Sequence, residues 1–160
     1  MYGIIEKKMV IYIKRGNIFK IDNVNNFAHG CNCAGAMGKG IALQFRKRFP
    51  LMYTQYKNLC ASGDFQLGDV FLYQFNEGFV FNLATQYSWK TKADENAIRT
   101  SLTKMLDIAC EYNIKQIAFP KIGAGLGGLD WLEVKLIIES AKLKSEALSD
   151  SLKGNIKLQI

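Results

Sequence analysis

The segment FPKIGAGLGGLDW, residues 119–131, places four glycines between an apolar strand and an amphipathic helix. The strand is predicted over Gln116–Pro120. The helix is predicted to begin near Leu129-Asp130, because the residues that follow repeat with helical spacing on one face: Val134, Ile137, Ile138 and Ala141. Glycine lets a ligand approach the backbone, and a helix N-terminus presents free N–H groups. The segment therefore predicts an anion-binding loop.

A second segment, HGCNCAGAMGKG at residues 29–40, has the same organisation. It follows a short buried strand predicted over Asn26–His29 and leads into a helix predicted over Gly40–Phe49, which Pro50 ends. Ligands of open α/β sheets bind beyond the carboxyl ends of the strands, where both loops would lie. Two such loops together predict a diphosphate site, although each could also be only a tight turn. Neither loop matches the Walker A motif or the G-x-G-x-x-G fingerprint.

The rest of the chain alternates between strand-like and helix-like segments, which predicts an α/β fold. The fold class expected is a three-layer α/β/α domain with a mixed, mostly parallel central sheet, formed as one domain by residues 1–160. The other elements expected are strands over Met9–Lys14, Val70–Phe75, Phe79–Ala84 and Ile156–Ile160, a helix over Leu51–Ala61, and a helix whose buried face carries Ile98, Leu102, Met105, Leu106 and Ala109.

Composition narrows the class of protein further. The formal charge of +7 comes from 21 basic and 14 acidic residues, which favours anionic partners and leaves DNA or RNA contact through a basic surface open. The C-x-C pair Cys31 and Cys33, with His29 as the single histidine, lacks the paired clusters of a zinc site, so we expect no metal and no cofactor. Without a long apolar run or a signal peptide, we expect a cytoplasmic monomer that does not contact the membrane.

Three blocks in order along the chain resemble the macrodomain family. They are Gly16-Asn17-Ile18-Phe19, then Asn32 followed by Met37-Gly38-Lys39-Gly40-Ile41-Ala42, and the segment at residues 119–131. The chain is most similar to the branch that contains terminal ADP-ribose glycohydrolases and antitoxins that remove ADP-ribose from DNA. The resemblance implies a cleft for ADP-ribose.

The resemblance also assigns positions within that cleft. Asn17 and Ile18 would lie near the adenine, the two glycine loops would bracket the diphosphate and distal ribose, and Asn32, Thr85 and Gln86 would face that ribose. The implied contacts are Asn17, Ile18, Asn32, Gly38, Lys39, Gly40, Ile41, Thr85, Gln86, Gly123, Ala124, Gly125, Leu126 and Gly127.

Three positions depart from the family pattern. Asn17 stands where the family commonly has aspartate, although its side-chain carbonyl could still accept from the adenine amino group. Gln86 replaces a catalytic lysine, and Gly127 replaces an aspartate found in some members. Glutamine is neither a nucleophile nor a titratable base. The candidate catalytic residues are therefore Asn32, to orient the distal ribose, and Gln86, to position a water, with the ligand phosphate as base.

Several other residues have competing interpretations. His29 could act as a base but is better explained by a structural hydrogen bond, and Asp130 by capping a helix. Trp131 and Phe119 are expected in the core. Tyr87 and Trp89 could stack on a ligand ring or pack over the cleft rim, with Lys90 as a surface charge.

Three functions remain open from the sequence. The first is hydrolysis that releases ADP-ribose from modified protein or nucleic acid, or acts on ADP-ribose 1″-phosphate as a phosphatase. The second is a non-catalytic module that binds ADP-ribose. The third is a protein that uses the fold to bind unmodified nucleic acid. The sequence leaves open which linkage is cleaved.

Overall fold

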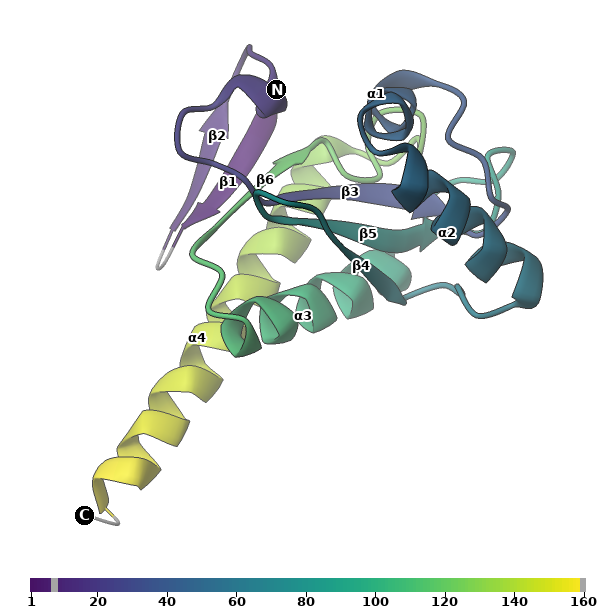
Figure 1. Ribbon diagram of the computed structural model, residues 1–160. Coiled ribbons are helices and arrows are strands. Elements are labelled where there is room, and N and C mark those ends of the chain that lie inside the picture. The colour runs from purple at the N-terminus through teal and green to yellow at the C-terminus, as the bar shows by residue number, and fades with distance from the viewer. Residues whose placement is uncertain (7–8, 159–160) are drawn as a thin grey trace.

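The computed structural model describes residues 1–6 and 9–158, and side chains up to residue 146. A six-stranded sheet in the order β2-β1-β6-β3-β5-β4 forms the centre of the molecule (Figure 1). The strands are β1 (Tyr2–Glu6), β2 (Met9–Ile13), β3 (Phe27–Asn32), β4 (Val70–Gln74), β5 (Phe79–Gln86) and β6 (Gln116–Pro120).

Helices cover both faces of this sheet, so the three-layer α/β/α expectation is confirmed (Figure 1). One layer contains α1 (Gly40–Arg48) and α2 (Pro50–Ser62), with the short 3-10 helix η1 (Ile18–Lys20). The other contains α3 (Glu95–Glu111) and α4 (Trp131–Leu158). Each layer has its own apolar core, because side chains that alternate along the strands point to opposite faces.

The sheet is mixed, as expected, but parallel pairing is confined to its centre. Strands β6, β3 and β5 are parallel, whereas β1 pairs antiparallel with both β2 and β6, and β4 pairs antiparallel with β5. The two edges are therefore hairpins, and the sheet is less parallel than predicted. In the N-terminal hairpin, β1 and β2 pair with Tyr2 opposite Ile13 and Glu6 opposite Met9.

Local signals set most helix ends where the sequence indicates. Pro50 is the first residue of α2, Gly63 ends that helix in the left-handed conformation at φ 78°, and the Asp94 side chain caps α3 by accepting from Ala97 N at 2.8 Å. The apolar face expected on α3 is buried. The prediction of a strand over Ile156–Ile160 is wrong for residues 156–158, which belong to α4. Residues 159–160 lie outside the described part of the chain.

The strand expected over Asn26–His29 is longer than predicted, because β3 continues to Asn32. Its last residues pair with β5, with His29 opposite Asn82 and Cys31 opposite Ala84. Gly30 permits this pairing, because a Cβ there would lie 2.8 Å from the Thr85 hydroxyl. The first glycine loop therefore begins at Cys33.

No helix within residues 1–6 and 9–158 is long and apolar enough to cross a membrane.

Candidate functional site

The two glycine loops lie at the same end of the sheet. Loop 1 (residues 33–39) joins β3 to α1 and loop 2 (residues 121–130) joins β6 to α4, and the parallel pairing of β3 with β6 brings their carboxyl ends together. The loops also approach each other, because a Cβ at Gly40 would lie 3.5 Å from Leu126 Cδ1. Leu126 is 73% exposed, so this contact is at the surface. Figure 1 shows the green segment after β6 passing close to α1.

Loop 2 presents unpaired backbone donors. Its turns are closed by hydrogen bonds from Gly128 N to Gly125 O (3.2 Å) and from Leu129 N to Gly123 O (2.9 Å). Within the described part of the chain, the intervening N–H groups of Gly125, Leu126 and Gly127 donate to no protein acceptor. A Cβ at Gly125 would have no heavy atom within 4 Å, so the space beside this backbone is open. Consecutive free amides beside open space form a binding site for an anion.

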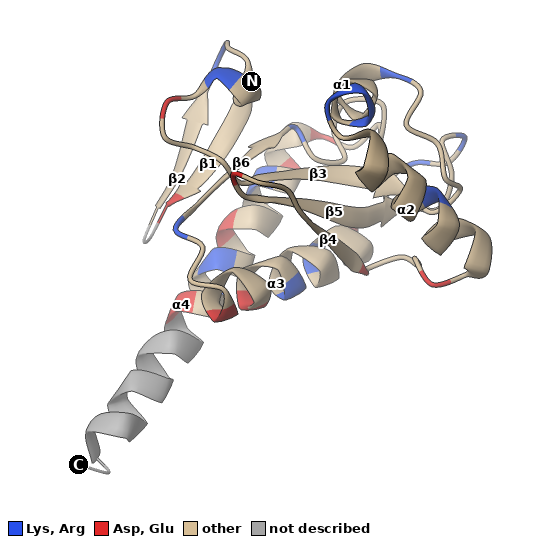
Figure 2. Cartoon of the chain, viewed as in Figure 1, with Lys and Arg blue, Asp and Glu red and all other residues tan. Residues whose placement is uncertain are grey.

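The N-terminus of α1 supplies a second set of donors. Lys39 is the N-cap residue, and its side chain makes no capping hydrogen bond. The first N–H groups of a helix have no partner within the helix and lie at the positive end of its dipole. Gly38 is also open, since a Cβ there would meet no atom within 4 Å. Figure 2 shows basic residues on α1 and on the loops beside it, which adds positive charge at this end of the molecule.

A third segment, residues 86–93, connects the two loops. Cys33 N of loop 1 donates to Gln86 O at 2.9 Å, and Ala93 N donates to Gly127 O of loop 2 at 2.9 Å. The Lys92 side chain lies along Gly128, where a Cβ would be 3.6 Å from Lys92 Cγ. This connection could not be predicted from the sequence, because it depends on backbone groups and leaves no residue signature.

Asn32 organises loop 1 through its own side chain. Asn32 Oδ1 accepts from Ala34 N at 3.0 Å and Ala36 N at 3.2 Å, while Nδ2 donates to Ala36 O at 2.8 Å. The buried Tyr56 hydroxyl, from α2, is 2.7 Å from Asn32 O and 3.0 Å from Oδ1. Tyr56 was missed from the sequence, where it resembles any core residue of a helix. One N–H of the Asn32 amide remains for a ligand.

The two residues at the end of β5 behave differently. Gln86 is half-buried, and its Nε2 donates to Thr91 O, so its amide is turned toward residues 88–93. Thr85 is only 2% exposed, with its hydroxyl 3.5 Å from Cys31 O. The Thr85 side chain therefore packs against β3, and its contact with a ligand stays a prediction.

The Gly16 segment forms η1. Asn17 is its N-cap, and Asn17 Oδ1 accepts from Phe19 N at 2.9 Å. Ile18 is buried among the α1 and α2 side chains of the core. The Asn17 oxygen retains a second lone pair for another donor.

His29 has the structural role favoured by the sequence. It is fully buried, stacks on Phe45 with ring centroids 3.9 Å apart, and its Nε2 lies 2.7 Å from Asn82 Oδ1. Asn82 Nδ2 in turn donates to Phe71 O at 3.1 Å. Burial lowers the pKa of His29 to about 4, so the imidazole is neutral at physiological pH and Nε2 carries the proton it donates to Asn82.

This buried imidazole makes the fold sensitive to mild acid. The unfolded chain takes up a proton near pH 6.5 but the folded chain only near pH 4, so stability is lost as the pH falls between these values. We expect the unfolding free energy to drop by about 1.5 kcal/mol between pH 6.5 and 5. Urea titrations at both pH values measure it. His29→Gln, which removes the only imidazole, should flatten this dependence; an unchanged slope would contradict the assignment.

The cysteines beside His29 are free thiols. Burial raises the pKa of Cys31 well above its usual value and that of Cys33 to about 11, which keeps both protonated at neutral pH. Across the described residues, no three His, Cys, Asp or Glu side chains gather to hold a metal ion.

Other residues singled out in the sequence have clear positions. Asp130 precedes α4, and its carboxylate accepts from Leu132 N at 3.1 Å, which confirms the capping interpretation. Phe119 is buried in the core, whereas Trp131 is only half-buried at its edge, against Tyr12. Lys90 is exposed, with its ammonium 4.9 Å from the Trp89 ring centroid.

The fold defines an α/β domain whose two glycine loops lie together beyond the carboxyl ends of the central strands. A family model of the Macro domain matches residues 28–138, and the chain belongs to that family. The chain is 36% identical over 114 residues to a DNA ADP-ribosyl glycohydrolase of Mycobacterium tuberculosis. The aligned region covers 69% of this chain and 32% of that protein.

Solved structures agree with this family. The macrodomain of Mycobacterium tuberculosis DarG superposes with a TM-score of 0.74 at 32% identity, covering 81% of this chain and 88% of that one. Thermosipho africanus DarTG in complex with ADP-ribose gives a TM-score of 0.65 at 25% identity, over 71% of this chain and 33% of that chain. The present chain spans about a third of the length of the glycohydrolase that it matches.

Proposed function

We propose that this protein binds ADP-ribose and hydrolyses the bond that joins its distal ribose to a modified nucleic acid or protein. The observation that carries the proposal is the pair of donor sets on facing loops: free amides at Gly125, Leu126 and Gly127, and the uncapped N-terminus of α1. Two converging sets of N–H groups suit the two phosphates of a diphosphate. The nearness of Leu126 in loop 2 to Gly40, the first residue of α1, supports binding by both donor sets at once.

The remaining parts of the ligand follow from this placement of the diphosphate. The adenine would lie toward Asn17 and Ile18. Its amino group would donate to Asn17 Oδ1, which already accepts from Phe19 N at the start of η1 and has a second lone pair. The distal ribose would lie toward Asn32 and Gln86, at the ends of the adjacent strands β3 and β5. A relative of the same family was solved with ADP-ribose bound, which supports the ligand class.

The resemblance implies that Gln86 stands where related hydrolases commonly carry a catalytic lysine, so hydrolysis would proceed without an amine nucleophile at this position. Asn32 is held by four hydrogen-bonding contacts, so its free N–H can orient the ribose with little loss of entropy. Gln86 would position the attacking water with its side-chain carbonyl and its second N–H, or with the N–H that now donates to Thr91 O once that hydrogen bond breaks. The ligand phosphate would accept the proton, and the loop amides would stabilise negative charge.

The first experiment measures release of free ADP-ribose from base-modified DNA, from glutamate-modified protein, and from ADP-ribose 1″-phosphate. We expect turnover of modified DNA, because relatives carry the name DNA ADP-ribosyl glycohydrolase. Gln86→Ala should lower kcat by roughly 10- to 100-fold, because loss of the side chain that positions the attacking water slows the reaction by about that factor. Gln74→Ala, at the opposite end of the sheet, serves as the matched control.

Each other outcome selects a different function. Turnover of ADP-ribose 1″-phosphate alone would identify a phosphatase. Measurable ADP-ribose binding without turnover of any substrate would identify a binding module, and the hydrolase proposal would fall. Salt-sensitive binding of unmodified oligonucleotide that free ADP-ribose does not affect, with no ADP-ribose affinity, would favour nucleic-acid binding instead.

A further inference from the structure

Two large aromatic side chains are exposed on the segment that connects the glycine loops. Tyr87 is 70% exposed and Trp89 is 64% exposed, two residues apart just after β5. Aromatic rings of this size usually bury most of their surface, so two of them held in solvent beside the paired glycine loops indicate a contact surface. We call residues 87–92 the aromatic segment.

The aromatic segment is ordered by its own hydrogen bonds. Ser88 N donates to Thr91 Oγ1 at 3.2 Å, Thr91 Oγ1 donates to Ser88 O at 3.0 Å, and Lys90 N donates to Ser88 Oγ at 3.2 Å. Its two ends are tied to loop 1 and loop 2 through Gln86 O and Ala93 N. The rings are therefore presented on a preorganised turn, which lowers the entropy lost when they bind a partner.

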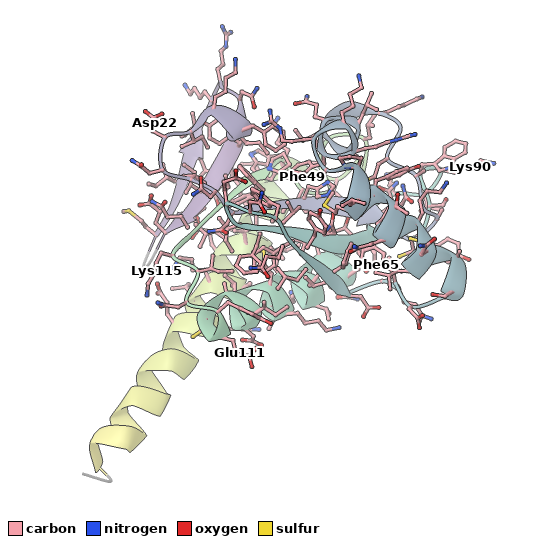
Figure 3. All side chains as sticks on the ribbon, in the orientation of Figure 1. Asp22, Phe49, Phe65, Lys90, Glu111 and Lys115 are labelled. Carbon is pink, nitrogen blue, oxygen red and sulfur yellow. The ribbon has the colours of Figure 1, made fainter. Side chains whose placement is uncertain are left out.

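The aromatic segment contains two lysines, Lys90 and Lys92. The Lys90 ammonium lies 4.9 Å from the Trp89 ring centroid, and Lys92 lies along Gly128 of loop 2. In Figure 3, Lys90 is labelled at the outer edge of the molecule, projecting away from the body. The chain as a whole carries a formal charge of +7. Two exposed rings followed by two lysines suit a single-stranded nucleic acid, whose bases stack on aromatic faces while its phosphates attract the lysines.

We propose that Tyr87 and Trp89 form a stacking platform for the unpaired bases next to the ADP-ribosylated nucleotide of single-stranded DNA. The inference rests on the proposed function, because the aromatic segment borders the distal-ribose side of that site through Gln86. The platform requires unpaired bases, since a duplex hides the base faces inside its stack. The platform determines which acceptor strand enters the site, and it contributes nothing to the binding of free ADP-ribose.

The test compares Trp89→Ala, Trp89→Phe and Tyr112→Ala in the full chain. Tyr112 is a matched control, because it is 57% exposed but packs beside Phe79, at the opposite end of β5. The probe is a fluorescently labelled dodecamer of thymidine, followed by anisotropy at low salt. We expect Trp89→Ala to weaken binding roughly tenfold or more, and Trp89→Phe to stay within about threefold of wild type, because every aromatic ring offers a stacking face.

Two further readouts separate a platform from a general effect on the site. Free ADP-ribose should bind all three variants with the wild-type Kd, and KM for an ADP-ribosylated oligonucleotide should rise in Trp89→Ala while kcat stays unchanged. The proposal would be overturned if Trp89→Ala bound the dodecamer as tightly as wild type does, or if Trp89→Ala also lost affinity for ADP-ribose. It would also be overturned if wild type bound a double-stranded dodecamer as tightly as the single strand. If wild type does not bind ADP-ribose, the proposed function fails, whereas the dodecamer comparison still decides the platform.

Discussion

Gly125→Glu is expected to abolish ADP-ribose binding in a protein that still folds. A Cβ at residue 125 has no neighbour within 4 Å, so the added side chain enters open space and does not disturb the core. That space borders the free amides of Gly125, Leu126 and Gly127, where the diphosphate is proposed to lie. A carboxylate there would occupy the anion site and repel the phosphates. Like charges in contact cost several kcal/mol, so affinity should fall by at least about 100-fold.

Calorimetric titration with ADP-ribose measures this loss, and thermal unfolding confirms that the variant folds. Gly125→Gln is the matched control, because glutamine has nearly the same shape without the charge. We expect Gly125→Gln to bind more weakly than wild type and more tightly than Gly125→Glu. Wild-type affinity in a folded Gly125→Glu protein would mean that loop 2 does not hold the diphosphate.

Gly127→Ala is expected to damage both stability and binding, although it adds a single methyl group. A Cβ at residue 127 would lie 2.6 Å from Gly123 O, a backbone atom that cannot move without shifting the loop. The same shift would strain the hydrogen bond from Ala93 N to Gly127 O. Overpacking of this kind costs about 1–3 kcal/mol, and each kcal/mol lowers Tm by roughly 2–4 °C in a domain of this size. The displaced amides should weaken ADP-ribose binding by about tenfold or more.

Gly125→Ala is the control for this prediction, since it places the same methyl group two residues away in open space. Its Tm should remain close to wild type, because the added methyl group meets no protein atom within 4 Å. Tm and ADP-ribose affinity measured on both variants give the comparison. If Gly127→Ala and Gly125→Ala had the same Tm, the close approach of residue 127 to Gly123 O would contribute nothing to stability.

The close approach at Gly127 also explains one departure from the family pattern. Some relatives carry an aspartate at this position, as judged by resemblance, but any side chain here meets the Gly123 carbonyl. Loop 2 therefore follows a path that only glycine allows at residue 127. An aspartate at residue 127 would require a different course of the loop.

Much of the architecture could be predicted from local patterns. The strand at Gln116–Pro120, the helix start at Pro50 and the buried face of α3 follow from periodicity, proline and glycine, whose effects act within a few residues. The family assignment followed from three short blocks and is confirmed by the match to the Macro domain over residues 28–138. The assignment of individual ADP-ribose contacts and of Asn32 and Gln86 as catalytic groups stays a prediction.

Other features depend on neighbours distant in the sequence. The burial of the Thr85 side chain depends on Gly30 and Cys31 of the neighbouring strand β3, and its contact with the ligand stays a prediction. The strand β3 continues to Asn32 because β5 offers partners there, and no local signal marks that length. The strand expected at Ile156–Ile160 is helical as far as Leu158.

The sequence by itself determined that this protein is an α/β domain with two glycine loops suited to an anion, because glycine placement and apolar period are properties of short segments. Only the tertiary structure decided that the loops meet at Gly40 and Leu126, that Ala93 and Gln86 connect them, and that Tyr87 and Trp89 stand exposed beside them. These relations depend on strand order and backbone hydrogen bonds, which no single segment encodes.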